Sequence, residues 1–98
     1  MVSLTAVERS TEEDIARELE GSPWRQEGGT IVLDRKLRDF AAAMTWINHV
    51  AEVAERANHH PDILVHGWNQ VRLTLTTHSA GGLTSGDFQL ARTIDAID

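Results

Sequence analysis

The chain has 98 residues and a formal net charge of −6 that divides evenly, because residues 1–49 and residues 50–98 each carry −3. This length predicts a single domain, and the absence of cysteine excludes disulfides, thiolate metal sites and a cysteine nucleophile. Nucleic-acid binding needs a cationic surface and a membrane span needs about 20 consecutive apolar residues, so we expect neither kind of partner.

The N-terminal third predicts a helix and then a hairpin. The sequence does not begin with basic residues followed by an apolar stretch, which is the pattern of a secretory signal. We therefore expect a cytoplasmic protein. A capping-box pattern at 10–13 begins the helix, and Gly21 and Pro23 end it. Two strand-like runs follow at 24–26 and 30–33, and the two glycines between them favour a hairpin turn.

Residues 37–57 predict the longest helix, because apolar side chains recur there every three or four positions. Such a helix would be about 30 Å long at 1.5 Å per residue. Pro61 ends the helical pattern and moves His60 out of helical geometry. The apolar face expected on this helix consists of Leu37, Phe40, Ala41, Met44, Ile47, Ala51 and Ala54.

The C-terminal part predicts a second pair of strands and a last helix. Residues 62–68 are compatible with a strand, and residues 71–78 alternate apolar and polar side chains. A second capping box at 84–87 begins a helix that continues to Ile97. The order α-β-β-α-β-β-α predicts an α+β fold, with a four-stranded antiparallel sheet and helices packed on one face.

Three histidines and two carboxylates gather between Glu55 and Asp87. Glu55 and His59 are four residues apart and would share a helix face, where the carboxylate and the helix C-terminus both favour a protonated imidazole. His60 and His78 lie at the ends of other elements and could converge on the same pocket. Histidine can both give and take protons near neutrality, so the sequence predicts a candidate acid–base site.

Each of these residues also has a purely structural interpretation. His59 could cap its helix, His60 could be a surface residue before a proline, and His78 could be solvated on a polar strand face. Asp87 is the acidic member of a capping box. Trp68 could pack in the core or serve as a stacking platform for a flat ligand.

A zinc site is a sharper alternative, because His59, His60 and His78 with Glu55 or Asp87 could supply three or four ligands. Adjacent histidines on a diverging backbone rarely aim at one ion, however, and the spacing matches no common zinc motif. The remaining histidines are interpreted as structural or solvated; they are His49 and His66.

Taken together, the spacing of these residues resembles the signature of the pterin-4a-carbinolamine dehydratases. That signature is an acidic or polar residue, three spacers, His-His-Pro, an aromatic residue, a later histidine and a final aspartate. It is met by Glu55, His59, His60, Pro61, Trp68, His78 and Asp87. The flanking sequence NQVRLTLTTHSAGGLTSGDFQLA is also similar to the family, and the resemblance covers about residues 37–97.

The resemblance implies one domain over residues 1–98, with the fold predicted above, in a homodimer or homotetramer. It implies removal of water from a pterin substrate, 4a-hydroxytetrahydropterin, to give quinonoid dihydropterin, which recycles the cofactor of aromatic amino acid hydroxylases. No metal and no organic cofactor would be needed. A non-catalytic pterin-binding module, or a coactivator-like interaction module, is the alternative.

The resemblance also implies a role for each site residue. His59 and His78 would be the proton-transfer pair, and His60 would bind and orient the pterin and share in the proton transfer. Glu55 would orient the histidines, and Asp87 would orient His78 or hold its loop. Trp68 would bind substrate at the pocket edge.

Overall fold

The computed structural model describes residues 8–97. In chain order its elements are α1 (Glu12–Leu19), β1 (Arg25–Glu27), β2 (Thr30–Lys36), α2 (Phe40–Ala57), β3 (Asp62–His66), β4 (Gln70–Leu75), the 3₁₀ helix η1 (His78–Ala80) and α3 (Ser85–Asp95). The predicted order α-β-β-α-β-β-α is therefore confirmed, with η1 as an addition.

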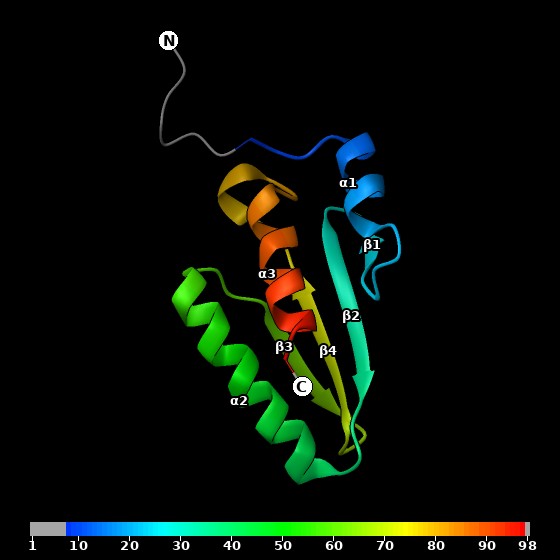
Figure 1. The fold of residues 1–98 in the computed structure, drawn as a ribbon, viewed down its shortest axis with the longest axis vertical. Coiled ribbons are helices and arrows are strands. Elements are labelled where there is room, and N and C mark those ends of the chain that lie inside the picture. Colours follow the sequence, from blue (N-terminus) through cyan, green and yellow to red (C-terminus); the bar gives the residue numbers. More distant parts are fainter. Residues whose placement is uncertain (1–7, 98) are drawn as a thin grey trace.

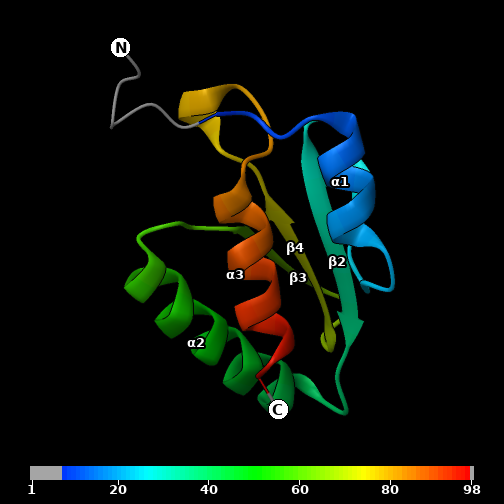
Figure 2. The ribbon, with the colours of Figure 1, turned by 45° about the horizontal axis from the view of Figure 1, so that its top comes forward.

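The four strands form one antiparallel sheet in the order β1-β2-β4-β3. The three α-helices lie over one face of this sheet, and α3 runs along its middle (Figures 1 and 2). The predicted α+β architecture is confirmed. Because β3 pairs with β4 alone, it forms one edge of the sheet. Within residues 8–97, no helix has both the length and the apolar character needed to cross a bilayer.

The core lies between the helices and the covered sheet face. Ile31 and Leu33 on β2 pair with Leu75 and Leu73 on β4, and all four side chains are buried. Burying one such side chain contributes roughly 1.5–3 kcal/mol. The central strands therefore hold the sheet rigid at the end of β4, where the chain continues into the candidate site.

The core-facing side of α2 differs from the expected one. Phe40, Ala41 and Ala51 are exposed, and only Ile47 and Ala54 of the predicted face are buried. The physical reason is that two apolar stripes overlap on this helix, and the sheet covers the one that carries the larger, central side chains. The buried residues of α2 are Ala43, Trp46, Ile47, Val50 and Ala54.

The start of α2 was predicted three residues too early. Asp39 is its N-cap, and its carboxylate accepts a 2.8 Å hydrogen bond from the Ala42 N–H, which lowers the pKa of the Asp39 carboxyl. Leu37 lies outside the helix, where its N–H donates to the Asn69 carbonyl at 2.8 Å and its carbonyl accepts from Asn69 Nδ2 at 2.9 Å. The loop before α2 is thereby tied to the β3–β4 turn.

Several other boundaries also differ from the prediction by one to three residues, and those of α1 and β4 matter most here. The N-cap of α1 is Thr11, with Asp14 completing the capping box, one residue later than the predicted box at 10–13. Strand β4 ends at Leu75, and His78 begins η1 instead of ending a strand. The alternation of side chains along β4 therefore cannot be extended to His78.

Candidate active site

The C-terminus of α2 fixes the backbone of the two adjacent histidines. Asn58 adopts a left-handed conformation, with φ 49° and ψ 43°. Its N–H donates to the Glu55 carbonyl and the His59 N–H donates to the Ala54 carbonyl, both at 3.1 Å. This is a Schellman arrangement, and asparagine is one of the few non-glycine residues that adopt it readily. His59 is therefore held at a defined angle to the helix.

His59 is in hydrogen-bond contact with Asp87, which lies 28 positions further along the chain. Its Nε2 lies 2.5 Å from Asp87 Oδ1. The Asp87 side chain is fully buried and that of His59 is 22% exposed. A buried carboxylate next to an imidazole fixes the orientation and the tautomer of the ring. The pair thus links the end of α2 to the start of α3.

Asp87 also completes the N-terminus of α3. Its Oδ2 accepts a hydrogen bond from the Thr84 N–H at 3.0 Å, and the predicted capping box at 84–87 is confirmed. The same oxygen accepts from Thr77 Oγ1 at 2.8 Å, and Thr77 Oγ1 in turn lies 2.8 Å from Thr84 Oγ1. Asp87 therefore has hydrogen-bond donors on both oxygens, as a buried carboxylate requires.

His60 pairs with Glu55 instead of with Asp87. Its Nε2 contacts Glu55 Oε2, and both side chains are exposed to solvent. The expected pairing of Glu55 with His59 is therefore wrong, because the helix ends between them and the left-handed turn directs His59 towards α3. Exposed pairs of this kind contribute little to stability, and the His60 ring, which is 59% exposed, is accessible from solvent.

His78 reaches the same end of the molecule along a different route. It is exposed in η1, directly after Thr77, which bonds to Asp87. Consecutive Cα atoms are about 3.8 Å apart, so His78 lies next to the network that holds His59. The expectation that Asp87 orients His78 is not met directly, since the described hydrogen bonds of Asp87 go to His59, Thr77 and Thr84.

A cavity of about 390 Å³ opens beside His59. It lies between the end of α2, the segment after β4 and the start of α3. Most of its lining residues have polar side chains, whose hydroxyl and amide groups can match the hydrogen-bonding edge of a flat heterocycle. Its lining residues are Ala57, Asn58, His59, Thr77, Thr84, Ser85, Gly86, Gln89, Leu90 and Thr93.

Trp68 is not brought to this cavity. It lies in the β3–β4 turn, at the opposite end of β3 from His60, and its φ of 60° is in the left-handed region. Strand β3 lies between the two positions, and the four steps from Asp62 to His66 alone span about 13 Å at 3.3 Å per residue. Trp68 is therefore not among the residues that line the cavity.

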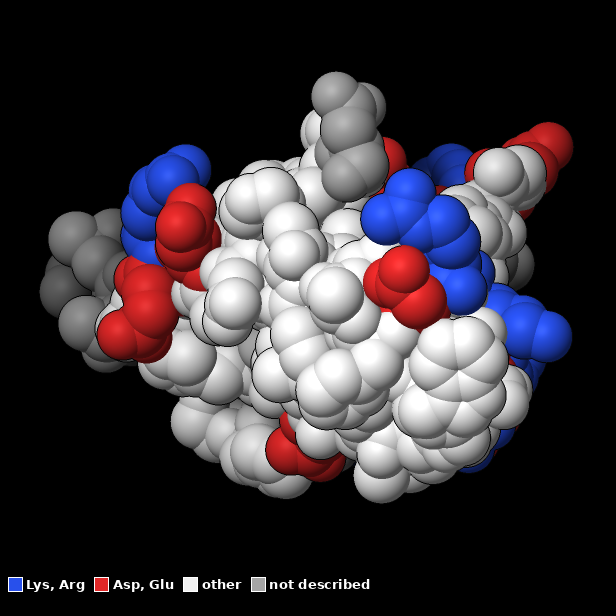
Figure 3. Space-filling view, turned by 90° about the horizontal axis from the view of Figure 1, so that it is seen from below, with Lys and Arg blue, Asp and Glu red and all other residues white. Residues whose placement is uncertain are grey.

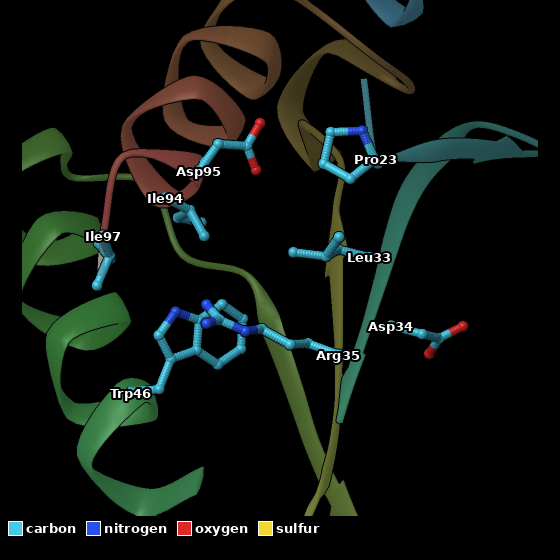
Figure 4. Close-up of a pocket in the computed structure, with 8 residues that line it drawn as sticks. All are labelled: Pro23, Leu33, Asp34, Arg35, Trp46, Ile94, Asp95 and Ile97. Atoms are coloured by element: carbon cyan, nitrogen blue, oxygen red, sulfur yellow. The ribbon is translucent and has the colours of Figure 1, made fainter. Parts of the chain in front are cut away.

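A second cavity, of about 370 Å³, lies between β2, the N-terminal half of α2 and the end of α3 (Figure 4). Arg35 lies over the Trp46 ring there, 4.8 Å from its centroid. None of the predicted site residues lines it, so we do not assign the candidate site to it.

The residues of the zinc alternative are divided between separate pairs. His59 contacts Asp87, while His60 contacts Glu55. Among residues 8–97, no three His, Asp or Glu side chains come together as a metal ion would need. The set of ligands considered from the sequence is therefore not assembled in this structure.

A family model described as Pterin 4 alpha carbinolamine dehydratase matches residues 8–97. The chain belongs to this family. The family and the enzyme class expected from the signature, a hydro-lyase, are thereby confirmed. The match covers all of the described residues, including both carboxylate–histidine pairs.

Relatives of known sequence and structure agree with this membership. A protein of Chloroflexus aurantiacus, provisionally named a pterin-4-alpha-carbinolamine dehydratase, is 50% identical over 90 residues, which are 91% of this chain and 96% of the relative. One from Nocardia farcinica with the same provisional name is 47% identical over 88 residues, which are 89% and 92% of the two chains.

Two solved structures share the fold. One, described as a transcriptional coactivator/pterin dehydratase from Brucella melitensis, is 32% identical with a TM-score of 0.84, over 90% of this chain and 96% of that one. The other is a pterin dehydratase-like protein described as a RuBisCO assembly factor in the alpha-carboxysome. It is 22% identical with a TM-score of 0.62, over 74% and 86% of the two chains, and so shows the fold alone.

The structure adds residues that the dehydratase signature does not contain. Thr77 and Thr84 donate hydrogen bonds to Asp87, the carboxylate that also contacts His59. Ser85 and Gln89 line the cavity beside His59. The capping box at 84–87 was the available signal, because it places the first turn of α3 around the buried carboxylate. What the sequence could not show is that His59 would be the partner of that carboxylate.

Proposed function

We propose that this protein dehydrates 4a-hydroxytetrahydropterin to quinonoid dihydropterin, and so recycles the pterin cofactor of aromatic amino acid hydroxylases. The observation that carries the proposal is the contact between His59 and the fully buried Asp87, at the margin of a cavity whose lining residues mostly have polar side chains. Membership of the pterin-4a-carbinolamine dehydratase family supports the choice of substrate.

The reaction requires two proton movements. The C4a–O bond breaks as a proton reaches the departing hydroxyl group, which leaves as water, and a second proton leaves a ring nitrogen of the pterin. Positioned acids and bases contribute about 10²–10⁴-fold to such steps. With Nε2 in contact with Asp87, His59 has Nδ1 left for proton exchange, and the carboxylate holds the ring in that orientation. The products are quinonoid dihydropterin and water.

His59 and His78 form the proposed proton-transfer pair. His78 is exposed and directly follows Thr77. The Thr77 hydroxyl group and the His59 ring both contact the Asp87 carboxylate. His60 binds and orients the pterin and shares in proton transfer, with Glu55 holding its ring. No organic cofactor or metal enters this scheme.

Absorbance provides the test of the proposal. The substrate is generated in place by a hydroxylase, and its dehydration is followed with and without the folded protein. We expect acceleration over the spontaneous rate, and a bell-shaped pH–rate profile that loses one limb in His78→Ala. A folded protein that leaves the spontaneous rate unchanged would refute the function, and full kcat in His78→Ala would refute that residue's role.

A non-catalytic interaction module is the second candidate. It is favoured by the description of the Brucella melitensis structure as a coactivator as well as a dehydratase. In such a module the buried Asp87 would serve only to cap α3, and His59→Gln would leave partner binding unchanged. Catalytic rates of that variant therefore separate the two candidates.

We also propose that the protein is a cytoplasmic homo-oligomer. Its lack of cysteine means that its stability does not depend on an oxidising compartment. The exposed apolar side chains on β3, Ile63 and Leu64, support association between copies.

A further inference from the structure

One buried indole group lacks a hydrogen-bond partner. Trp46 is 3% exposed, and its Nε1 finds no acceptor among residues 8–97. The other buried indole, that of Trp24, donates to Asp95 Oδ1 at 2.8 Å. Nearly all buried donors in native proteins are paired, because an unpaired one loses the hydrogen bonds that it made to water. The Trp46 N–H is therefore available to an acceptor from outside the described chain.

Arg35 brings a positive charge to the covered face of the sheet. Side chains alternate along a strand, so the half-buried Arg35 shares the core-facing side of β2 with Ile31 and Leu33. Its partner on β4 is Val71, which is buried. An apolar side chain is expected at such a position. A charged one needs a polar partner there, because desolvation of an unpaired charge is unfavourable.

The guanidinium group of Arg35 has no carboxylate partner among the described residues. Its Cζ lies 4.8 Å from the centroid of the Trp46 ring, which is a cation–π contact. Its neighbour Asp34 is paired with Arg25 and Arg72 instead. Guanidinium has five N–H donors, so Arg35 retains donors for an anion.

These two donor groups line the same cavity of about 370 Å³. Figure 4 shows the indole nitrogen of Trp46 directed towards Ile94 and Ile97, with the guanidinium end of Arg35 over the ring. Asp95 lies at the other end of the cavity, where Trp24 donates to it. Cavities of this size with apolar walls and a few convergent polar groups are typical of small-molecule sites. The apolar lining residues are Pro23, Leu33, Ile94 and Ile97.

The end of β2 carries an excess of positive charge. Residues 34–39 contain three basic and two acidic side chains, and one of the acids is the Asp34 that pairs with two arginines. Figure 3 shows this end of the molecule, where Lys and Arg side chains gather on one side of a largely uncharged centre. Although the whole chain has a net charge of −6, this local excess attracts an anion.

We propose that this cavity binds a small carboxylic acid with an apolar body. The Arg35 guanidinium group donates to the carboxylate in the bidentate geometry that suits this pair, and the apolar body lies against Leu33, Ile94 and Ile97. Because Trp46 Nε1 has almost no accessible surface, Arg35 turns off the ring towards the ligand before the indole N–H becomes the second donor. No residue lines both this cavity and the one beside His59, so the inference does not depend on the proposed dehydratase function.

The Trp46 indole N–H provides a direct readout in a nitrogen–proton correlation spectrum. The chain has three tryptophans, whose indole peaks are assigned with single Trp→Phe variants. The probe is 3-phenylpropanoate, which has one carboxylate and an apolar body. We expect it to shift the Trp46 peak saturably and to leave the peak of the exposed Trp68 in place. No saturable shift up to about 10 mM, which corresponds to very weak binding, overturns the proposal and leaves water as the partner of the N–H.

The amide of the same acid tests whether the carboxylate is recognised. Its shape is nearly the same but it has no charge, so 3-phenylpropanamide should bind roughly 10-fold or more weakly. Inorganic phosphate has the charge without the apolar body and should not displace the acid. Equal affinity of acid and amide, or displacement by an equal concentration of phosphate, contradicts the proposed chemistry. Both comparisons use the wild-type chain and so do not depend on the folding of a variant.

Two matched variants on β2 test the role of Arg35. Arg35→Met removes the guanidinium group and keeps an unbranched side chain beside Trp46. Lys36→Met makes the same change of charge on the opposite face of the strand, at an exposed position. We expect affinity for 3-phenylpropanoate to fall roughly 10- to 100-fold in the first variant and less than about threefold in the second. Wild-type affinity in Arg35→Met, or an equal loss in both variants, refutes the assignment of the carboxylate to Arg35.

Discussion

Replacing Asp87 by Asn changes the charge of the site with almost no change in shape. The Asp87 carboxylate accepts three hydrogen bonds, from His59, Thr77 and Thr84. An amide has one oxygen and a donor NH₂ group. If that oxygen keeps the hydrogen bonds from Thr77 and Thr84, the NH₂ group faces His59 Nε2. The ring must then move its proton to Nδ1, the nitrogen that exchanges protons with the substrate.

The expected size of the effect follows from the number and type of these bonds. Three charge-assisted hydrogen bonds become two neutral ones to the amide oxygen and one donated by the amide. Charged bonds contribute about 1.5–3 kcal/mol each and neutral ones about 0.5–1.5 kcal/mol. Part of this loss is offset because a charge is no longer buried. We expect Asp87→Asn to lower the free energy of unfolding by about 1–3 kcal/mol.

The effect on catalysis should be larger than the effect on stability. A histidine in the wrong tautomer loses its function as a base, and kcat should fall by about 10²–10⁴-fold. Stability is measured by urea denaturation and kcat by dehydration of the enzymatically generated substrate. Glu55→Gln is the matched control, because it makes the same chemical change in the exposed pair with His60. It should change stability by less than about 0.5 kcal/mol.

Two results would refute this reasoning. If Asp87→Asn is no less stable than Glu55→Gln, the buried network does not stabilise the fold as described. If stability falls but kcat stays within about threefold of wild type, Asp87 only caps α3. Such a fall in kcat is smaller than the loss of a proton-transfer group produces.

Three further predictions concern other parts of the fold. Trp24→Phe removes the 2.8 Å hydrogen bond from Nε1 to Asp95, and should lower stability in urea by at least about 1 kcal/mol. The hydrogen bond from Arg72 is the main cause of the lowered pKa of the Asp34 carboxyl, so Asp34 stabilises the fold above its unfolded pKa of about 3.9. The stability gap between wild type and Asp34→Asn should therefore shrink as the pH falls from 5 to 2, and a constant gap would contradict it. Trp68→Gly relieves a positive φ and should leave stability unchanged or raise it by up to about 1 kcal/mol.

The arrangement of the fold could be predicted from the sequence because its signals are local. Alternation in β4, the capping box at 84–87 and the paired glycines of the first hairpin each specify one element. The core side of α2 could not be chosen this way. Two apolar stripes overlap on that helix, and only packing against the sheet selects the one with Trp46 and Val50.

The members of the candidate site could be predicted, but their partners could not. The signature identified both histidines at the end of α2 and the aspartate at the start of α3. Sequence spacing suggested Glu55 as the partner of His59, because the two share a helical interval of four. The left-handed Asn58 ends that interval one residue before His59. Pairing of His59 with a residue 28 positions away depends on how α2 and α3 pack, which no local pattern contains.

The dual role of Asp87 explains how a chain of 98 residues holds an acid–base group in place. One oxygen of the carboxylate closes the first turn of α3, and the other fixes the imidazole that follows α2. Precise sites are those whose side chains are locked by packed elements and by supporting hydrogen bonds. Here a single buried side chain supplies both, so the position of His59 is as well defined as the contact between the two helices. A substitution that loosens that contact should therefore reduce catalysis before it unfolds the protein.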